Sequence, residues 1–284
     1  MAKFPPYVGK LERTWHYTYL TICGLVFLYL ILPIIMIVPL SFNAEPYFTF
    51  TEGMLAFDPD AYSTRWYTDF FTSKSWIHSI KNSFIIAIAA TFLATALGTL
   101  AALGLSRPHM PARELIMSIL ISPMIVPLII SGAAMFFFYS QINLAQTHLG
   151  VILAHAALGT PFVVITVTAT LVGFDRSLIR AANNLGADQR VTFFKVILPL
   201  IAPGVISGAL FAFITSFDEV VIVLFLAGYE QRTIPLEMWS GIREQISPTI
   251  LAVATMLITI SIVMLASLEM LRRRSERQRG MSPG

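Results

Sequence analysis

Two adjacent carboxylates, Asp218 and Glu219, interrupt a long apolar stretch of this chain. An acid at the centre of a membrane helix costs on the order of 2.5–3.5 kcal/mol, so such a group normally faces a cavity or a partner. Carboxylates attract cations, and the nearby rings of Phe213 and Phe217 can add cation–π attraction of about 0.5–2 kcal/mol. We therefore expect these four residues to line a path for a cation. The alternative is a structural ion pair or hydrogen bond to a neighbouring helix.

The composition places this apolar stretch in a membrane protein. Of 284 residues, 56% are hydrophobic and only 12% are charged, whereas soluble domains carry roughly 25% charged residues. The net charge of +3 then reflects basic loops beside a membrane rather than a nucleic-acid partner. The single cysteine, Cys23, excludes an internal disulfide and a cysteine-based metal site. We expect no metal or cofactor in this chain.

Apolar runs of about 20 residues predict an all-α, polytopic fold with six transmembrane helices. We expect residues 1–284 to form one transmembrane domain. The predicted spans cover residues 18–41, 83–105, 115–139, 149–173, 200–226 and 249–271.

The positions of lysine and arginine predict the orientation of these spans. Fourteen of the 19 basic residues lie in the two tails and in the loops at 106–114 and 174–199. Basic loops stay on the cytoplasmic side. Both termini and the 174–199 loop are therefore predicted to be cytoplasmic, and segment 42–82 is predicted to lie on the opposite side of the membrane. Segments 42–82 and 227–248 carry a slight excess of acids.

Segment 42–82 contains "RWYTDFFTSKSW", in which aromatic and charged residues are mixed at helical spacing. This pattern predicts a short helix at the membrane surface. We expect Trp66, Phe70 and Trp76 to anchor it at the interface. The alternative is a docking surface for an external partner.

The 174–199 loop has the pattern of two short helices separated by a glycine. Asp175 is placed to cap a helix that runs to about Leu185. Gly186 fits the left-handed position that ends a helix at low cost. Asp188 is placed to cap a second helix, which Pro199 is expected to close before the next span. A compact unit of this shape suits a loop that a soluble partner grips, although an amphipathic linker has the same periodicity.

The predicted fifth span carries a stripe of small residues. Small residues every four positions let helices approach closely. Two roles are possible: contact with a partner subunit, or packing within this chain. At 100° per residue, Asp218 points about 200° away from the last residue of the stripe. The stripe consists of Gly204, Gly208, Ala212 and Ser216.

The 174–199 loop resembles the EAA motif of binding-protein-dependent ABC importer permeases. That motif reads Glu-Ala-Ala, three residues, Gly, nine residues, Ile, any residue, Leu-Pro. The matching positions are Ala181, Ala182, Gly186, Leu198 and Pro199. Arg180 stands where the motif has glutamate, and Val196 stands where it has isoleucine. The first change reverses a charge, so a salt bridge made through that acid does not carry over.

The resemblance covers nearly the whole chain and looks closest to spermidine/putrescine permease subunits. It rests also on "RWYTDFF", "ISPMIVP", "TPFVVITV", "GFDRSLIRAANNLGA", "SFDEVVIVLFLAG" and "TIPLEMWSGIREQISPTILAVATML". It implies a second permease subunit, two ATPase subunits and a periplasmic substrate-binding protein as partners, besides the lipid bilayer. It also implies a place in the inner membrane of a bacterium, with segment 42–82 in the periplasm. It also implies that Asp188 and the matching motif positions, with Arg180, form an ATPase-coupling loop.

The chain lacks the G-x-x-x-x-G-K-[ST] loop that binds nucleotide phosphates. ATP and its magnesium are therefore expected on the partner ATPase, and this chain is expected to be a transport subunit rather than an enzyme. The other class of function is an ion-coupled secondary transporter or channel with Asp218 and Glu219 as ion sites. The helix–glycine–helix loop discriminates between them, because a proton-coupled carrier has no need of such a lever.

Overall fold

The computed structural model describes residues 9–107, 109–244 and 247–278, and this part of the chain is helical. Its only extended pairing is an isolated bridge between Asn43 and Tyr62. The predicted all-α class is confirmed. The elements are α1 (Lys10–Leu40), α2 (Glu52–Leu55), η1 (Pro59–Ala61), α3 (Arg65–Thr72), α4 (Lys74–Leu105), α5 (Arg113–Ile125), α6 (Leu128–Gln141), α7 (His148–Val172), α8 (Ser177–Asn184), α9 (Gln189–Thr192), η2 (Phe193–Ile197), α10 (Leu198–Asp218), α11 (Val221–Leu226), η3 (Tyr229–Gln231), α12 (Ile234–Glu244) and α13 (Thr249–Gln278).

Five helical stretches of the described chain are long and apolar enough to cross a membrane, and the count is six if α5 and α6 form one span. The predicted span over 115–139 is divided between two helices, α5 and α6, which meet at a bend of 102°. Val126 has an extended backbone, with φ −68° and ψ 131°, and Pro127 follows it. The proline ring disfavours helical geometry in the residue before it, so the sequence itself causes the break.

The chain divides into two compact units, residues 1–70 with 246–258 and residues 71–245 with 259–284. Each unit is described by itself. The expectation of one transmembrane domain over residues 1–284 stays a prediction.

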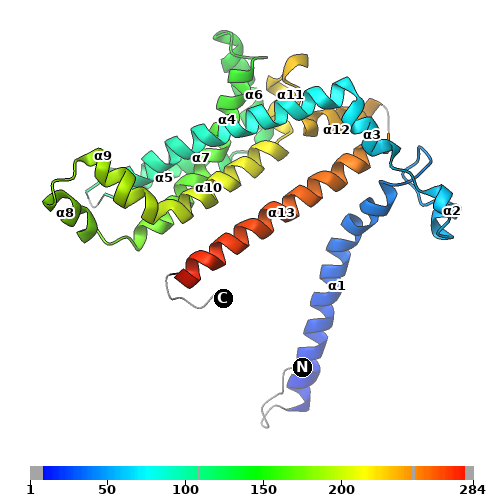
Figure 1. The fold of residues 1–284 in the computed structure, drawn as a ribbon, viewed down its shortest axis with the longest axis horizontal. Helices are drawn as coiled ribbons and strands as arrows, with labels where there is room; N and C mark the ends of the chain where they lie inside the picture. The colour runs from blue at the N-terminus through cyan, green and yellow to red at the C-terminus, as the bar shows by residue number, and fades with distance from the viewer. Residues whose placement is uncertain (1–8, 108, 245–246, 279–284) are drawn as a thin grey trace. The chain divides into compact units, whose positions relative to one another are not determined.

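In the first unit, α1 is one long helix (Figure 1). None of its side chains is buried. The segment after it folds around Asn43, whose side-chain amide donates to the carbonyls of Tyr47 and Thr49 at 3.1 and 3.0 Å. The indole of Trp66 donates to the Asn43 carbonyl at 2.7 Å. These bonds satisfy buried polar groups, so they give the segment a defined shape without regular secondary structure.

The expectation that three aromatic residues anchor this region at the membrane interface needs correction. Trp66 is half-buried and bonded within the protein, as described above. Phe70, in α3, and Trp76, in α4, are only 4% and 8% exposed. Their rings are covered by protein, because burial of a large aromatic surface stabilises the fold more than contact with lipid headgroups.

The core of the second unit consists of α4, α7 and α10, which pack along one another (Figure 1). Small residues allow the close contact. A Cβ atom added at Gly159 of α7 would lie 3.0 Å from the Cβ of Ala212 and 3.3 Å from that of Ala94. Close approach of backbones through small side chains is the usual way that membrane helices associate.

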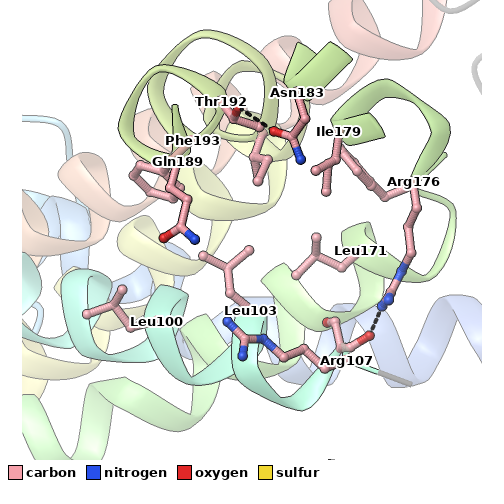
Figure 2. A pocket seen from close by; sticks show the side chains of 13 residues that line it. Leu100, Leu103, Arg107, Leu171, Arg176, Ile179, Asn183, Gln189, Thr192 and Phe193 are labelled. Atoms are coloured by element: carbon pink, nitrogen blue, oxygen red, sulfur yellow. Dashed lines mark hydrogen bonds between the residues drawn. The ribbon is translucent and has the colours of Figure 1, made fainter. Parts of the chain in front are cut away.

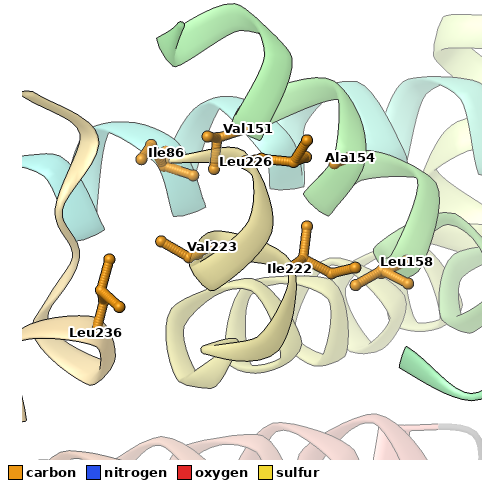
Figure 3. Packing of buried hydrophobic residues seen from close by; sticks show 8 residues of the cluster. All are labelled: Ile86, Val151, Ala154, Leu158, Ile222, Val223, Leu226 and Leu236. Atoms are coloured by element: carbon orange, nitrogen blue, oxygen red, sulfur yellow. The ribbon is translucent and has the colours of Figure 1, made fainter. Parts of the chain in front are cut away.

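A second cluster of the same unit surrounds the short helix α11. Figure 3 shows Ile222, Val223 and Leu226 of α11 turned toward side chains of α4, α7 and α12. Helix α11 is therefore anchored by its own apolar side chains. The partners are Ile86, Val151, Ala154, Leu158 and Leu236.

Candidate functional site

The first helix of the 174–199 loop is α8, and Asp175 secures its start. One carboxylate oxygen accepts from the Ser177 amide at 2.8 Å, and the other accepts from the Ser177 hydroxyl at 2.6 Å. The predicted capping role of Asp175 is confirmed, although Arg176 occupies the cap position itself. The hydrogen bond from the Ser177 hydroxyl is the main reason that the pKa of Asp175 lies below its ordinary value. The Ser177 amide and the charge of Arg180 act in the same direction.

Gly186 ends α8 in the left-handed conformation, with φ +81°, as predicted. The amide of Ala187 donates to the Ala182 carbonyl at 3.0 Å, and the amide of Gly186 donates to the Asn183 carbonyl at 3.0 Å. This pair of bonds defines the Schellman motif. A Cβ atom at position 186 would meet no atom within 4 Å, so glycine is favoured here by its backbone conformation and not by lack of space.

The second helix starts at Asp188, as predicted, because its carboxylate accepts from the Val191 amide at 2.7 Å. The hydroxyl of Thr192 donates to the side-chain oxygen of Asn183 at 3.4 Å. This bond joins the second helix to α8. The loop therefore consists of two short helices that a side-chain hydrogen bond joins.

The expectation that Pro199 closes the second helix is wrong. Helix α9 continues through a π-helical turn, η2, into α10, and together they form one helix of 30 residues from Gln189 to Asp218. In this turn the amide of Leu198 donates to the Phe193 carbonyl. Pro199 has no amide hydrogen to donate, but it lies in the first turn of α10, directly after the π-turn and Leu198. The loop is therefore continuous with the membrane span.

The first helix of the loop presents several side chains on its outside. Arg180 and Ala181 are exposed, and Ala182 is half-buried. Leu178 and Leu185 are 42% and 89% exposed. An ordinary amphipathic linker would bury these leucines against the bundle.

The predicted fifth span, 200–226, is broken at the two carboxylates. Helix α10 ends at Asp218, Glu219 has an extended backbone, and α11 starts at Val221. Glu219 is 8% exposed, and its carboxylate accepts from the Ile222 amide at 3.0 Å. The side chain thus satisfies a backbone donor that the break leaves free.

The two acids have different surroundings. Asp218 is exposed, and within the described part of the chain its carboxylate has no hydrogen bond or ion pair. The alternative of a structural partner therefore fits Glu219, which caps α11, and not Asp218. Close to Asp218, the rings of Phe213 and Phe217 stack at 5.4 Å, and Phe84 meets Phe217 edge to face at 5.2 Å.

The stripe of small residues on α10 packs within the chain, which is the second of its two predicted roles. A Cβ atom at Gly208 would lie 2.8 Å from the Cα of Val163 in α7. The hydroxyl of Ser216 lies 2.8 Å from Nδ1 of His155, also in α7. Since Gly204, Gly208, Ala212 and Ser216 are all buried within the chain, this face is not available for the alternative role, contact with a partner permease subunit.

Asn82 is a polar residue of structural importance that the sequence did not lead us to predict. The side-chain amide of Asn82, in α4, donates to the carbonyls of Glu230 and Arg232 at 2.7 and 2.9 Å. Its oxygen lies 3.1 Å from Nε2 of His148. Asn82 thus joins α4, the start of α7 and the turn before α12. The signal in the sequence is an asparagine at the edge of an apolar run.

These features define a class of protein. An apolar helical bundle with a helix–glycine–helix loop that projects from it and continues into one span is typical of a membrane permease subunit. The chain matches the model of the family described as "Binding-protein-dependent transport system inner membrane component" over residues 94–277. It therefore belongs to that family, and it is a multi-pass, inner-membrane permease subunit of an ABC importer.

Individual relatives agree with this assignment. The chain is 30% identical to the spermidine/putrescine transport system permease protein PotC of Haemophilus influenzae, over 88% of this chain and 94% of that one. It is 31% identical to the putrescine transport system permease protein PotI of Escherichia coli, over 83% of each chain.

A solved structure has the same fold. The chain is similar to a chain of a bacterial ABC transporter involved in the import of the acidic polysaccharide alginate. The TM-score is 0.71 at 17% identity, over 93% of this chain and 99% of that one.

Proposed function

We propose that this permease subunit passes a small cationic or zwitterionic amine, such as a polyamine, from a periplasmic binding protein to the cytoplasm. The transport is driven by ATP. The observation that carries the choice of solute is the carboxylate of Asp218 at the break between α10 and α11, which has no partner among the residues that the structure describes. The names of the PotC and PotI relatives support the same class of solute.

The chemistry near Asp218 suits an amine. A carboxylate without an internal partner replaces part of the hydration that an ammonium group loses when it leaves water. The stacked rings of Phe213 and Phe217 offer aromatic faces, each worth about 0.5–2 kcal/mol of cation–π attraction. Helix breaks in membrane transporters commonly mark the sites where solutes bind. We assign Asp218 to the path and Glu219 to the cap of α11, because the Glu219 carboxylate is buried and bonded.

The loop supports the second part of the proposal, which concerns the ATPase. Exposed apolar side chains beside water, such as Leu178 and Leu185, are typical of an interaction surface. We propose that they enter a cleft of the ATPase subunit. The assembly contains two ATPase subunits, which bind ATP and magnesium, and a second permease subunit.

The continuous helix gives a physical route between the two sites. Gln189 lies in the loop and Asp218 ends the same helix of 30 residues, which spans roughly 45 Å at 1.5 Å per residue. A helix of this kind is stiff along its axis. A displacement of the loop by the ATPase would therefore move Asp218.

The alternative of an ion-coupled secondary transporter or channel is less well supported. It requires two free acids as ion sites, whereas Glu219 already bonds the Ile222 amide. Membership of the binding-protein-dependent family also favours an importer that uses a separate ATPase.

The test is uptake by the complete complex with Asp218→Asn. We expect uptake of putrescine or spermidine to fall at least tenfold, while assembly and basal ATPase activity stay near normal, because Asn keeps the size but removes the charge. Glu219→Gln is the matched control. Its amide oxygen can still accept from Ile222, so uptake should be retained. Normal uptake by Asp218→Asn, or a cognate solute that is anionic, would remove the charge argument.

A further inference from the structure

A cavity of about 610 Å³ separates the α8–α9 loop from the ends of α4 and α7. Figure 2 shows side chains from these elements turned toward a common space. A smaller hollow of about 230 Å³ shares part of its wall, including Ser106, Leu171 and Arg176. The two hollows together form one recess at the end of the spans from which the loop projects.

The recess is basic on one side. Arg107 and Arg176 line the larger cavity, and Arg113 and Arg176 line the smaller one, whereas neither lining contains an aspartate or glutamate. Arg176 donates a hydrogen bond to the backbone carbonyl of Ser106. Among the residues that the structure describes, the guanidinium groups of Arg107 and Arg113 have no hydrogen bond or ion pair. Three like charges repel one another, and the linings hold no carboxylate, so the recess favours an anion.

The other side of the cavity is apolar. Leu100, Leu103, Leu171 and Ile197 form this wall. Leu100 is 63% exposed, and Leu97, one turn earlier on the same face of α4, is 50% exposed. The apolar wall of the cavity therefore continues onto the outer surface of a membrane span, where hydrocarbon chains lie.

We propose that this recess binds an anionic phospholipid, with its phosphate at Arg107, Arg113 and Arg176 and an acyl chain along Leu100 and Leu103. Guanidinium groups match the geometry of phosphate oxygens, and basic pockets at the ends of spans are a recognised way to hold lipid headgroups. A free phosphate ion would satisfy the arginines but would leave the apolar wall unused. A lipid in this place lies against Ile179 and Asn183 of α8, and so supports the coupling loop from the membrane side.

The first experiment measures phosphatidylglycerol retained by the purified transporter complex. The complex is washed in mild detergent, titrated with phosphatidylglycerol and examined by native mass spectrometry. A surface arginine contributes roughly fivefold in affinity for anionic lipid. We therefore expect Arg107→Gln with Arg113→Gln to weaken retention by about 25-fold. Arg190→Gln is the matched control, because Arg190 is exposed on the same loop and does not line the recess. Equal retention by the double variant and the control would overturn the proposal.

Two further arms identify the ligand. Leu103→Trp fills the apolar part and leaves every charge in place, and it should also reduce retention at least fivefold. This variant keeps the test decisive if the arginine double variant fails to assemble. Inorganic phosphate and glycerol phosphate, at the concentration of the lipid, should not displace phosphatidylglycerol. Displacement by either of them, with no effect of Leu103→Trp, would show a site for a free anion and not for a lipid.

Discussion

At the scale of single residues, the backbone of Gly186 decides the shape of the coupling loop. Its φ of +81° lies in a region that costs other L-residues about 1–2 kcal/mol. A Cβ atom would meet no neighbour there, so the effect of a substitution reports on conformation alone.

We expect Gly186→Val to reduce ATPase co-purification and to abolish uptake, because a β-branched residue cannot adopt the left-handed conformation without strain. Gly186→Asn is the matched control and should be milder, since asparagine tolerates this conformation. Both are measured by co-purification and by uptake in the complete complex. If valine behaved like asparagine in both measurements, the lever hypothesis would fail.

Arg180 is the second residue whose effect can be predicted. It is exposed, and it stands where the family motif has glutamate. Exposed ion pairs contribute only about 0–1 kcal/mol, so Arg180→Glu should weaken binding of the ATPase by less than about tenfold. The measurement is the affinity of the permease pair for the ATPase. A larger loss, restored by reversal of an acid on the ATPase, would reveal a specific charge pair and contradict this expectation.

At the scale of elements, the contact between α7 and α10 holds the core of the second unit together. The small residues of α10 let its backbone approach α7, and the bond between Ser216 and His155 fixes the register of the two helices. The buried face of α10 therefore belongs to the stability of the chain itself.

Gly208→Leu should destabilise the isolated permease chain, because its Cβ atom alone would lie 2.8 Å from the Cα of Val163. Overpacking of this kind typically costs about 1–3 kcal/mol. The control is Ile206→Ala on the same helix, where the side chain is 49% exposed. Both variants are compared by thermal unfolding of the chain without partners. An unchanged midpoint for Gly208→Leu, with assembly lost, would instead assign the stripe to the partner subunit.

At the scale of the whole molecule, the orientation in the membrane follows from the basic loops and remains open to a direct test. We start from a chain with Cys23→Ser and introduce Glu230→Cys or Leu185→Cys, both on exposed side chains. A membrane-impermeant maleimide should label the first variant in intact cells whose outer membrane is permeabilised. The second should be labelled only after the inner membrane is opened. The reverse pattern would invert the predicted topology.

Sequence reasoning predicted the features that depend on local chemistry. The helical class follows from apolar runs long enough to cross a membrane. The caps at Asp175 and Asp188 and the left-handed Gly186 follow from side chains and backbone preferences that act within a few residues. Because these interactions are short in range, the residue types alone were enough to place them.

The tertiary structure decided which partner each buried group meets. Glu219 became a helix cap and Asp218 stayed without an internal partner, although the two are adjacent and chemically alike. Pro199 did not end the second loop helix, because a π-turn carries that helix on into α10 and the proline lies in the first turn of α10. The small-residue stripe faces α7 because the packing of three helices, and not the spacing of glycines, selects the neighbour. The partner of each group depends on contacts between residues far apart in the chain, and the pattern of residue types does not specify these contacts.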